Sequence, residues 1–338
     1  MSVPIIKNPR IKQGWLRVLL FGVCFCLITL LIAIPAVLTL TPVSKNDLQA
    51  DPIHTLAGLL TGNYLWLMLV LECIISLITV TLFRVFVDRK SLMSLGLGFD
   101  GYWVEALTGL FMGPGLLGIS ALLMLLSGHL EWTDIIWDGN QLFISLGLMA
   151  LIAFSEELVF RGYILGNLLD SFSPANGPSA NIPPASGSLS SAGGLSASGS
   201  PVSNRYIALG VSAILFAAFH VTNPGIHTLA LINLFLAGLL LGINYIYTRN
   251  LWFSFLFHLS WNFFQGPLLG FRVSGLSLPS VLEAETKGDL FITGGDFGLE
   301  GSILNTAVSL TALLILAWAF NRKYHHSAAG LPGAHTAG

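Results

Sequence analysis

Three short groups of polar side chains lie within otherwise apolar stretches of this sequence. The first group contains two adjacent carboxylates and a guanidinium, Glu156, Glu157 and Arg161, inside the apolar run 140–169. An ionisable side chain at the centre of a membrane helix costs on the order of 2.5 kcal/mol or more, so a chain that keeps three of them together usually has a use for them. A carboxylate in such a place can act as a general base.

Helical spacing gives the two glutamates different neighbours. Residues four apart share a face of a helix, whereas adjacent residues point about 100° apart. Arg161 follows Glu157 by four positions, which predicts an ion pair between them. We interpret this pair as a brace and Glu156, which points elsewhere, as the candidate base. The same three residues could instead only hold helices together.

Two further pairs of residues at a spacing of four lie in later apolar segments. Phe216 and His220 form one pair, and His258 and Asn262 form the other. A lone histidine in such a segment is more often a packing residue than a catalyst. Together with Glu156, however, these side chains offer a base, two imidazoles that can pass a proton, and an amide that can donate to an oxyanion.

The three groups form an ordered set of motifs with some flanking sequence: Glu156-Glu157-x-x-x-Arg161, Phe216-x-x-x-His220 and His258-x-x-x-Asn262, with Asp88-Arg89-Lys90-Ser91-Leu92, Leu95-Gly96-Leu97 and Val273-Ser274-Gly275. This set resembles the signature of the CAAX prenyl protease and bacteriocin-processing family of intramembrane endopeptidases, also called the CPBP or Abi family. The resemblance covers residues 84–275.

The resemblance implies hydrolysis of a peptide bond within the membrane. Glu156 would deprotonate a water molecule with the help of His220. His258 and Asn262 would then donate hydrogen bonds to the oxyanion of the tetrahedral intermediate. The neighbouring carboxylate and guanidinium would brace the base.

A metal site is the alternative to this glutamate-based site. Glu156, His220 and His258 could bind Zn²⁺ and leave a fourth position for water. The ligands would come from three separate helices, and the sequence contains no HExxH pair. The resemblance therefore favours a metal-independent enzyme without a cofactor.

Membrane helices are the elements that must position these residues. The chain has 338 residues, of which 54% are hydrophobic and 9% charged, whereas soluble proteins carry about 25% charged residues. A hydrocarbon core of ~30 Å needs about 20 apolar residues to cross it. Long apolar runs predict an all-α polytopic membrane bundle of about eight helices, at 15–41, 64–87, 102–127, 140–169, 205–222, 228–247, 251–270 and 303–320. Gly109 and Gly113 form a GxxxG pair, which predicts close helix packing.

Depth in the membrane separates the motifs along these helices. His220 follows Arg205 by a stretch of helix about 22 Å long, whereas His258 follows Trp252 by about 9 Å. Glu156 lies near the middle of its run. The motifs can therefore meet only if a helix is tilted, begins outside the bilayer, or has other boundaries.

The motifs divide the chain into three parts. We predict an N-terminal membrane segment of two helices at 1–83, a catalytic core at 84–275, and an outer loop, last membrane helix and disordered tail at 276–338. The Ser-, Gly-, Ala- and Pro-rich stretch 171–204 interrupts the core. It cannot bury a hydrophobic core of its own, so we interpret it as a flexible insertion.

Basic residues predict the orientation, because cytoplasmic ends of membrane helices are rich in Lys and Arg. With the N terminus in the cytoplasm, eight spans return the C terminus there, and only Lys45, Arg272 and Lys287 among the basic residues fall outside. We interpret the acidic residues of the outer loops as a solvated surface: Glu131, Asp134, Asp138, Glu283, Glu285, Asp289, Asp296 and Glu300.

We predict an integral membrane endopeptidase that cleaves a membrane-associated protein or peptide. The insertion and the tail indicate a bacterial chain in the cell membrane, where prenylated CAAX substrates are generally lacking. The lipid bilayer is a further partner, and no basic patch of the nucleic-acid-binding type is present. A non-catalytic immunity or scaffold protein of the same fold is the alternative function. A transporter that relays protons through its ionisable residues is a third.

Overall fold

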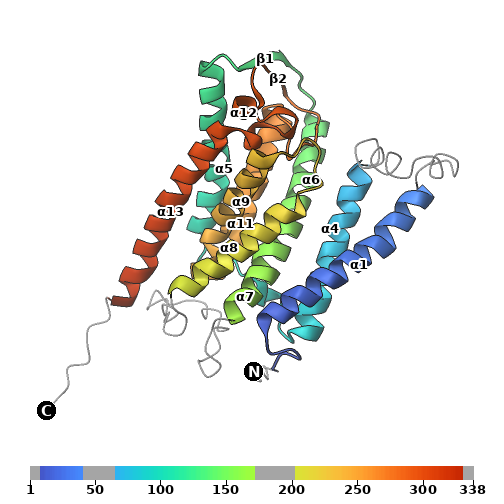
Figure 1. The fold of residues 1–338 in the computed structure, drawn as a ribbon, viewed down its shortest axis with the longest axis vertical. Coiled ribbons are helices and arrows are strands. Elements are labelled where there is room, and N and C mark those ends of the chain that lie inside the picture. Colours follow the sequence, from blue (N-terminus) through green and yellow to red (C-terminus); the bar gives the residue numbers. More distant parts are fainter. Residues whose placement is uncertain (1–7, 41–64, 172–201, 330–338) are drawn as a thin grey trace.

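The computed structural model describes residues 8–40, 65–171 and 202–329. They form a bundle of long helices with a two-stranded sheet at one end (Figure 1). The elements follow in the order α1 (Gly14–Leu40), α4 (Leu65–Leu82), η1 (Phe83–Val87), η2 (Leu92–Leu95), α5 (Trp103–Leu126), β1 (Leu130–Ile135), α6 (Gly139–Glu157), η3 (Leu158–Leu165), α7 (Gly166–Ser171), α8 (Val202–Phe219), α9 (Thr228–Ile243), α10 (Tyr245–Thr248), α11 (Trp252–Phe263), η4 (Phe264–Leu268), β2 (Leu282–Thr286), α12 (Leu290–Thr293), η5 (Gly295–Phe297), η6 (Leu299–Gly301) and α13 (Ile303–Ala329).

Six helical spans among the described residues are long and apolar enough to cross a membrane. They are α1, α4 with η1, α5, α6 with η3 and α7, α9 with α10, and α13. The predicted all-α polytopic membrane bundle is confirmed. The other two predicted spans, 205–222 and 251–270, are also largely helical, but α8 and α11 are shorter than a full span. These two shorter elements are the ones that bring the histidines of the motifs into the bundle.

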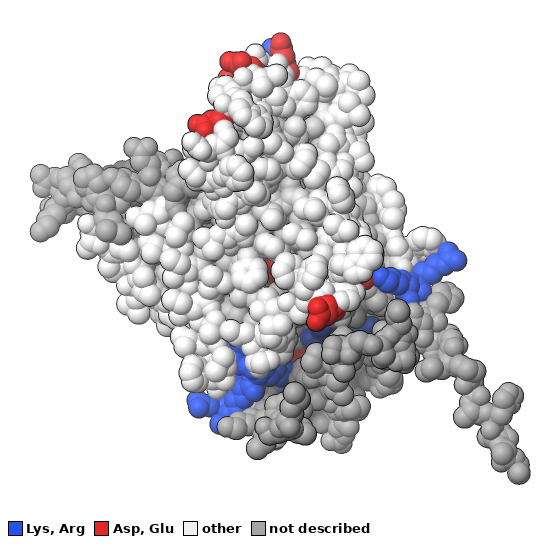
Figure 2. Space-filling view, turned by 180° about the vertical axis from the view of Figure 1, so that it is seen from behind, with Lys and Arg blue, Asp and Glu red and all other residues white. Residues whose placement is uncertain are grey.

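The surface of the molecule fits a lipid environment. Figure 2 shows most Lys and Arg near one end of the described residues and most Asp and Glu near the other, with a wide uncharged band between them. Large apolar side chains are exposed along the helices, among them Leu31, Phe111 and Phe143 at 70% or more of their surface. Exposed apolar area of this extent marks a membrane-facing surface, and the chain is an integral membrane protein.

Three helices widen into π-helical turns beside the motif residues. The turn η3 follows Glu157 directly, η4 follows the helix of Asn262, and η1 ends just before Asp88. In a π-helix the hydrogen bonds run from i to i+5, and such turns occur frequently at functional sites. A reading of the sequence by α-helical periodicity predicts none of them.

Close packing joins α5 to α11. Gly109 and Gly113 lie directly against α11, where a Cβ atom on Gly113 would come within 2.6 Å of the backbone nitrogen of Trp261. Glycine permits this approach because it has no side chain, and van der Waals packing of this kind holds membrane helices together. The predicted GxxxG contact is confirmed.

Asp88 joins the first helices to the bundle core. Its carboxylate accepts hydrogen bonds from Arg17 of α1 at 3.2 Å, from Arg84 of η1 at 2.9 Å and from Asn167 of α7 at 3.2 Å. Asp88 is fully buried, and a buried carboxylate needs such charged and polar partners. The network holds three separate chain segments at one end of the bundle.

The predicted insertion begins and ends in helix. Ser171 is the last residue of α7 and Val202 is the first of α8, so the helices extend into both ends of the range 171–204. Residues 172–201 lie outside the described residues, as do 330–338 of the predicted tail. The last helix is longer than predicted from the apolar run, because α13 continues to Ala329.

Candidate active site

The structure brings the predicted site residues together in the interior of the bundle. They come from the α6–η3 junction, the end of α8 and the middle of α11: Glu156, Glu157, Arg161, His220, His258 and Asn262. In Figure 1, α8 runs obliquely to α6. This tilt carries the end of α8 to the level of the glutamates and closes the difference in depth expected from the sequence.

Arg161 is held by three different helices. Its Nη1 donates to Oε1 of Glu157 at 2.7 Å, and its Nη2 donates to the carbonyl of Gly238 in α9 at 3.2 Å. The guanidinium also lies 4.5 Å from the centre of the Phe216 ring. The ion pair predicted from the spacing of four residues therefore forms, and both partners are buried.

Glu157 also binds the histidine of α11. Oε1 of Glu157 lies 2.8 Å from Nδ1 of His258. Because an ionised carboxylate only accepts hydrogen bonds, Nδ1 carries the hydrogen and Nε2 of His258 is left for other contacts. The same oxygen thus serves both Arg161 and His258, and it fixes the orientation of the imidazole.

His220 is oriented by its own helix. Its Nδ1 lies 2.8 Å from the carbonyl oxygen of Phe216. A carbonyl only accepts, so Nδ1 again carries the hydrogen and Nε2 is left with a lone pair. Nε2 lies 3.7 Å from Oε2 of Glu156. The Phe216-x-x-x-His220 motif therefore sets the tautomer of the histidine that faces Glu156.

One oxygen of Glu156 is free to react. Oε2 is buried and accepts no hydrogen bond from any described residue. Buried polar atoms are normally hydrogen-bonded, and Oε2 of Glu157 is a second buried oxygen without a donor among the described residues. Beside the lone pair of His220, Oε2 of Glu156 has the position and chemistry to bind and deprotonate a small molecule such as water.

A small cavity adjoins these side chains. His220, His258 and Asn262 line it, and it encloses about 50 Å³. About 10–15 Å³ of such space is enough for one water molecule, so the cavity can admit several. The two imidazoles and the amide are therefore neighbours around one space.

Comparison with protein families finds one match. Residues 138–264 match the family model described as Type II CAAX prenyl endopeptidase Rce1-like. The matching segment, called the Rce1-like domain below for this similarity, contains all six candidate residues. The match confirms the family resemblance carried by the motifs. Neither the comparison with curated proteins nor the comparison with solved structures found a match.

Glu300 also lines the cavity, although it lies outside the Rce1-like domain. The prediction of a solvated surface holds for outer-loop acids such as Glu131 and Glu283, which are exposed, but it is wrong for the partly buried Glu300. The backbone N–H and the Oγ of Ser274 both donate to its Oε1, the Oγ at 2.7 Å. Burial raises the pKa of the Glu300 carboxyl, and these hydrogen bonds oppose the rise. The Val273-Ser274-Gly275 motif was the only sequence signal near this contact.

Glu156, His220 and His258 are the residues of the zinc alternative. In the described part of the chain, no three His, Cys, Asp or Glu side chains are arranged to hold a metal ion. The Nδ1 atoms of His220 and His258 are engaged by a carbonyl and a carboxylate, which leaves Nε2 of each ring for another ligand, as in histidines that bind metals. The zinc alternative is therefore tested below by chelation, and we derive no step through a metal.

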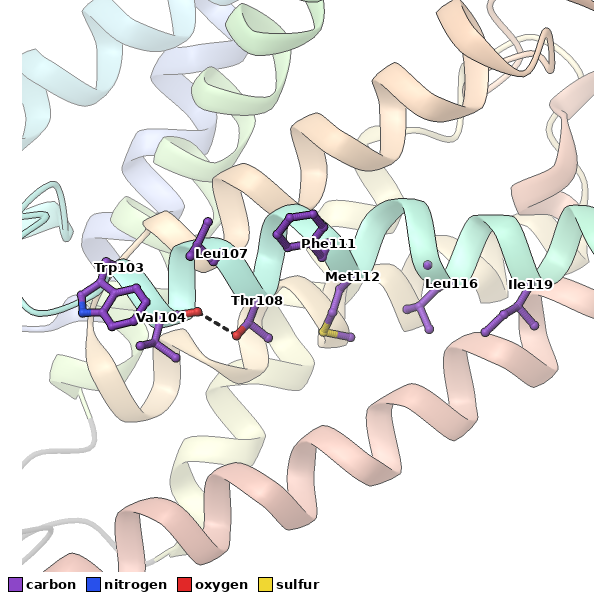
Figure 3. A pocket seen from close by; sticks show the side chains of 9 residues that line it. Trp103, Val104, Leu107, Thr108, Phe111, Met112, Leu116 and Ile119 are labelled. Carbon is purple, nitrogen blue, oxygen red and sulfur yellow. Dashed lines mark hydrogen bonds between the residues drawn. The ribbon is translucent and has the colours of Figure 1, made fainter.

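A larger groove lies on the outer face of α5, away from the Rce1-like motifs. It has a volume of about 570 Å³ and is lined by residues of α5 alone, with Trp103 at one end and Ile119 at the other (Figure 3). Its one hydroxyl, on Thr108, donates to the carbonyl of Val104 in the same helix at 2.7 Å. The groove offers no titratable group, so the candidate chemistry belongs to the smaller cavity.

Proposed function

We propose that this protein is an intramembrane endopeptidase that hydrolyses a peptide bond with a water molecule activated by Glu156. The Rce1-like match supports a protease of the membrane. The observation that carries the proposal is the pairing of Oε2 of Glu156 with Nε2 of His220 at 3.7 Å. A water molecule that lies beside this pair could make a hydrogen bond with each of the two atoms.

In the first step, Glu156 takes a proton from the water while His220 orients it. The oxygen of the water attacks the carbonyl carbon of the substrate, and a tetrahedral intermediate forms. Its negative oxygen needs donors. Asn262 supplies an amide N–H from the cavity wall, and His258 supplies Nε2–H in its imidazolium form, which the carboxylate of Glu157 stabilises.

In the second step, the intermediate collapses and the C–N bond breaks. The proton on Glu156 passes to the leaving nitrogen, directly or through His220, so that the carboxylate is restored. The products are a new carboxylic acid and a new amine, which become a carboxylate and an ammonium group when the acid gives its proton to the amine. The Glu157–Arg161 pair does not exchange a proton in this scheme, and its role is to hold His258 in place.

The substrate we propose is a membrane-associated protein or peptide without a required prenyl group. The location we propose is a bacterial cell membrane with both termini in the cytoplasm. This location follows from the basic residues, such as Lys12 and Arg322, at the end where α1 begins and α13 ends. The bilayer is then the one constant partner, and nucleic acid is not a partner.

The test is cleavage of membrane-tethered reporter peptides by the purified protein in detergent, with and without a zinc chelator. We expect Glu156→Gln and His258→Ala each to lower kcat/KM by roughly 10²- to 10⁴-fold, and the chelator to have no effect. Glu131→Gln, which changes an exposed glutamate, is the matched control. Equal activity of all variants would overturn the site assignment. Loss of activity on chelation, restored by Zn²⁺, would overturn the metal-free mechanism.

A further inference from the structure

Glu300 adds a negative charge to the wall of the cavity that His220, His258 and Asn262 line. We propose that this carboxylate selects substrates by binding a basic side chain, Lys or Arg, next to the scissile bond. The inference rests on the proposed function for the position of the scissile bond. It assigns a specificity role to a residue outside the segment that matches the Rce1-like family.

Ser274 holds the carboxylate in a fixed place. Its backbone N–H and its Oγ donate to the same oxygen, Oε1 of Glu300. Ser274 adopts a left-handed conformation with φ 48°. For a residue other than glycine, this conformation costs on the order of 1 kcal/mol and is concentrated at functional sites. The loop is therefore shaped so that its donors face Glu300.

The backbone of Glu300 is fixed as well. Its carbonyl accepts hydrogen bonds from the side-chain amides of Asn233 in α9 at 2.7 Å and Asn305 in α13 at 3.2 Å. Asn233 also donates to the carbonyl of Ser302 at 2.9 Å. Two membrane helices thus hold the short turn η6 from both sides, so the carboxylate is preorganised and loses little freedom on binding a ligand.

The carboxylate of Glu300 has no ion-pair partner from Lys or Arg among the described residues. Among the described residues, no Lys or Arg lies within ion-pair distance of Glu300, and the imidazole of His258 is the charged group that acts on it. A partly buried carboxylate is unfavourable without a positive partner. An ammonium or guanidinium of the substrate would supply this partner, whereas an acidic side chain would be repelled.

The shared cavity determines which residue of the substrate Glu300 contacts. Glu300 lines the same space as His258 and Asn262, which we place around the oxyanion. Because these side chains share one space, the residue that reaches Glu300 must be close to the reacting carbonyl. The expected specificity is therefore for a basic residue adjoining the cleaved bond, and not for a charge elsewhere in the substrate.

Binding tests this inference separately from cleavage. We would use the full-length Glu156→Gln protein in detergent and a set of membrane-tethered peptides in which a single lysine, norleucine or glutamate is placed at each position in turn. Lysine and norleucine differ by a charged amine on side chains of similar shape. Equilibrium affinities would be compared with those of the double variant Glu156→Gln, Glu300→Gln, with Glu156→Gln, Glu131→Gln as the control.

At one position we expect lysine to bind roughly tenfold or more tightly than norleucine, and glutamate more weakly than either. The Glu300→Gln change should abolish this preference and leave the affinity for norleucine unchanged, which also shows that the variant folds. If the Glu300→Gln variant does not fold, the inference is tested by the order of affinities of the lysine, norleucine and glutamate peptides for the Glu156→Gln protein. Equal affinities at every position, including an equal absence of binding, would overturn the inference. Failure of wild-type cleavage with the lysine preference intact would overturn the proposed function alone.

Discussion

At the scale of single residues, one carboxylate has two partners. Oε1 of Glu157 accepts from Arg161 at 2.7 Å and lies 2.8 Å from Nδ1 of His258. Glu156, its neighbour in sequence, makes one ion-pair contact among the described residues, at 3.7 Å with His220. The two glutamates should therefore differ in what they contribute, Glu157 to the structure of the site and Glu156 to the chemistry.

We expect Glu157→Gln to lower both activity and stability, and Glu156→Gln to lower activity alone. Loss of the charge at Glu157 leaves Arg161 buried without a counter-charge, and breaking a buried ion pair costs about 3–5 kcal/mol. The glutamine can also present its amide to His258 and disturb the tautomer. Thermal unfolding in detergent, measured beside cleavage, checks this. An equal Tm for the two variants would show that the brace is not structural.

The sequence predicts contacts within a helix better than contacts between helices. The spacing of four residues predicts the Glu157–Arg161 pair, because both residues lie on one helix. The contact of Glu157 with His258 and the carboxylate of Glu300 in the cavity depend on how helices pack and how a distant loop returns. No pattern in the sequence distinguishes Glu300 from the other acidic residues of its loop, so the sequence predicts an exposed side chain for all of them.

At the scale of elements, α5 supports the helix that carries His258 and Asn262. Gly109 and Gly113 lie against the backbone of α11, whereas Gly118 of the same helix has nothing within 4 Å of the place where a Cβ would be. The two kinds of glycine allow a comparison within one helix. Replacing Gly113 by alanine tests the packing of α5 against α11. Replacing Gly118 by alanine tests only the preference of a helix for alanine over glycine.

We expect Gly113→Ala to destabilise the protein by about 1–3 kcal/mol, because the added methyl group would clash with α11. It should also lower kcat, since a displacement of 1 Å at a catalytic group can cost about 10²-fold. Gly118→Ala should be neutral or stabilising by up to about 1 kcal/mol. Thermal unfolding and cleavage rates of both variants provide the check. A neutral Gly113→Ala would contradict a supporting role for α5.

Apolar composition was sufficient to predict the helices but not their irregularities. Each predicted span is largely helical because a lipid-exposed backbone must satisfy its own hydrogen bonds. The strands β1 and β2 pair Leu130 with Thr286 and Ile135 with Leu282 across a large separation in the chain. Such pairing depends on the fold that brings the segments together, so local sequence does not predict it.

At the scale of the whole molecule, the charges are divided between the two ends of the bundle (Figure 2). Lys12 lies just before α1 and Lys287 just after β2, at opposite ends in Figure 1. Because the two lysines lie at opposite ends of the bundle, a label placed at each position shows which side of the membrane that end faces.

We expect a Lys287→Cys variant in intact cells to react with a membrane-impermeant maleimide, and a Lys12→Cys variant to react only after the cells are permeabilised. The native Cys24, Cys26 and Cys73 would first be replaced by alanine. The expectation follows from the excess of basic residues on the cytoplasmic side. Labelling of Lys12→Cys without permeabilisation would show that the proposed orientation is inverted.

The π-helical turn η3 sets how far the chain rotates along this segment. It lies between Glu157, which binds His258, and Asn167, which binds Asp88 at the end of the bundle. If Leu158–Leu165 were wound as an ordinary α-helix of the same length, everything beyond would turn by roughly 100° or more. Asn167 would then leave Asp88. The wide turn thus sets the phase between the two ends of the helix, and ordinary α-helical winding there would uncouple them even if every side chain of the site were kept.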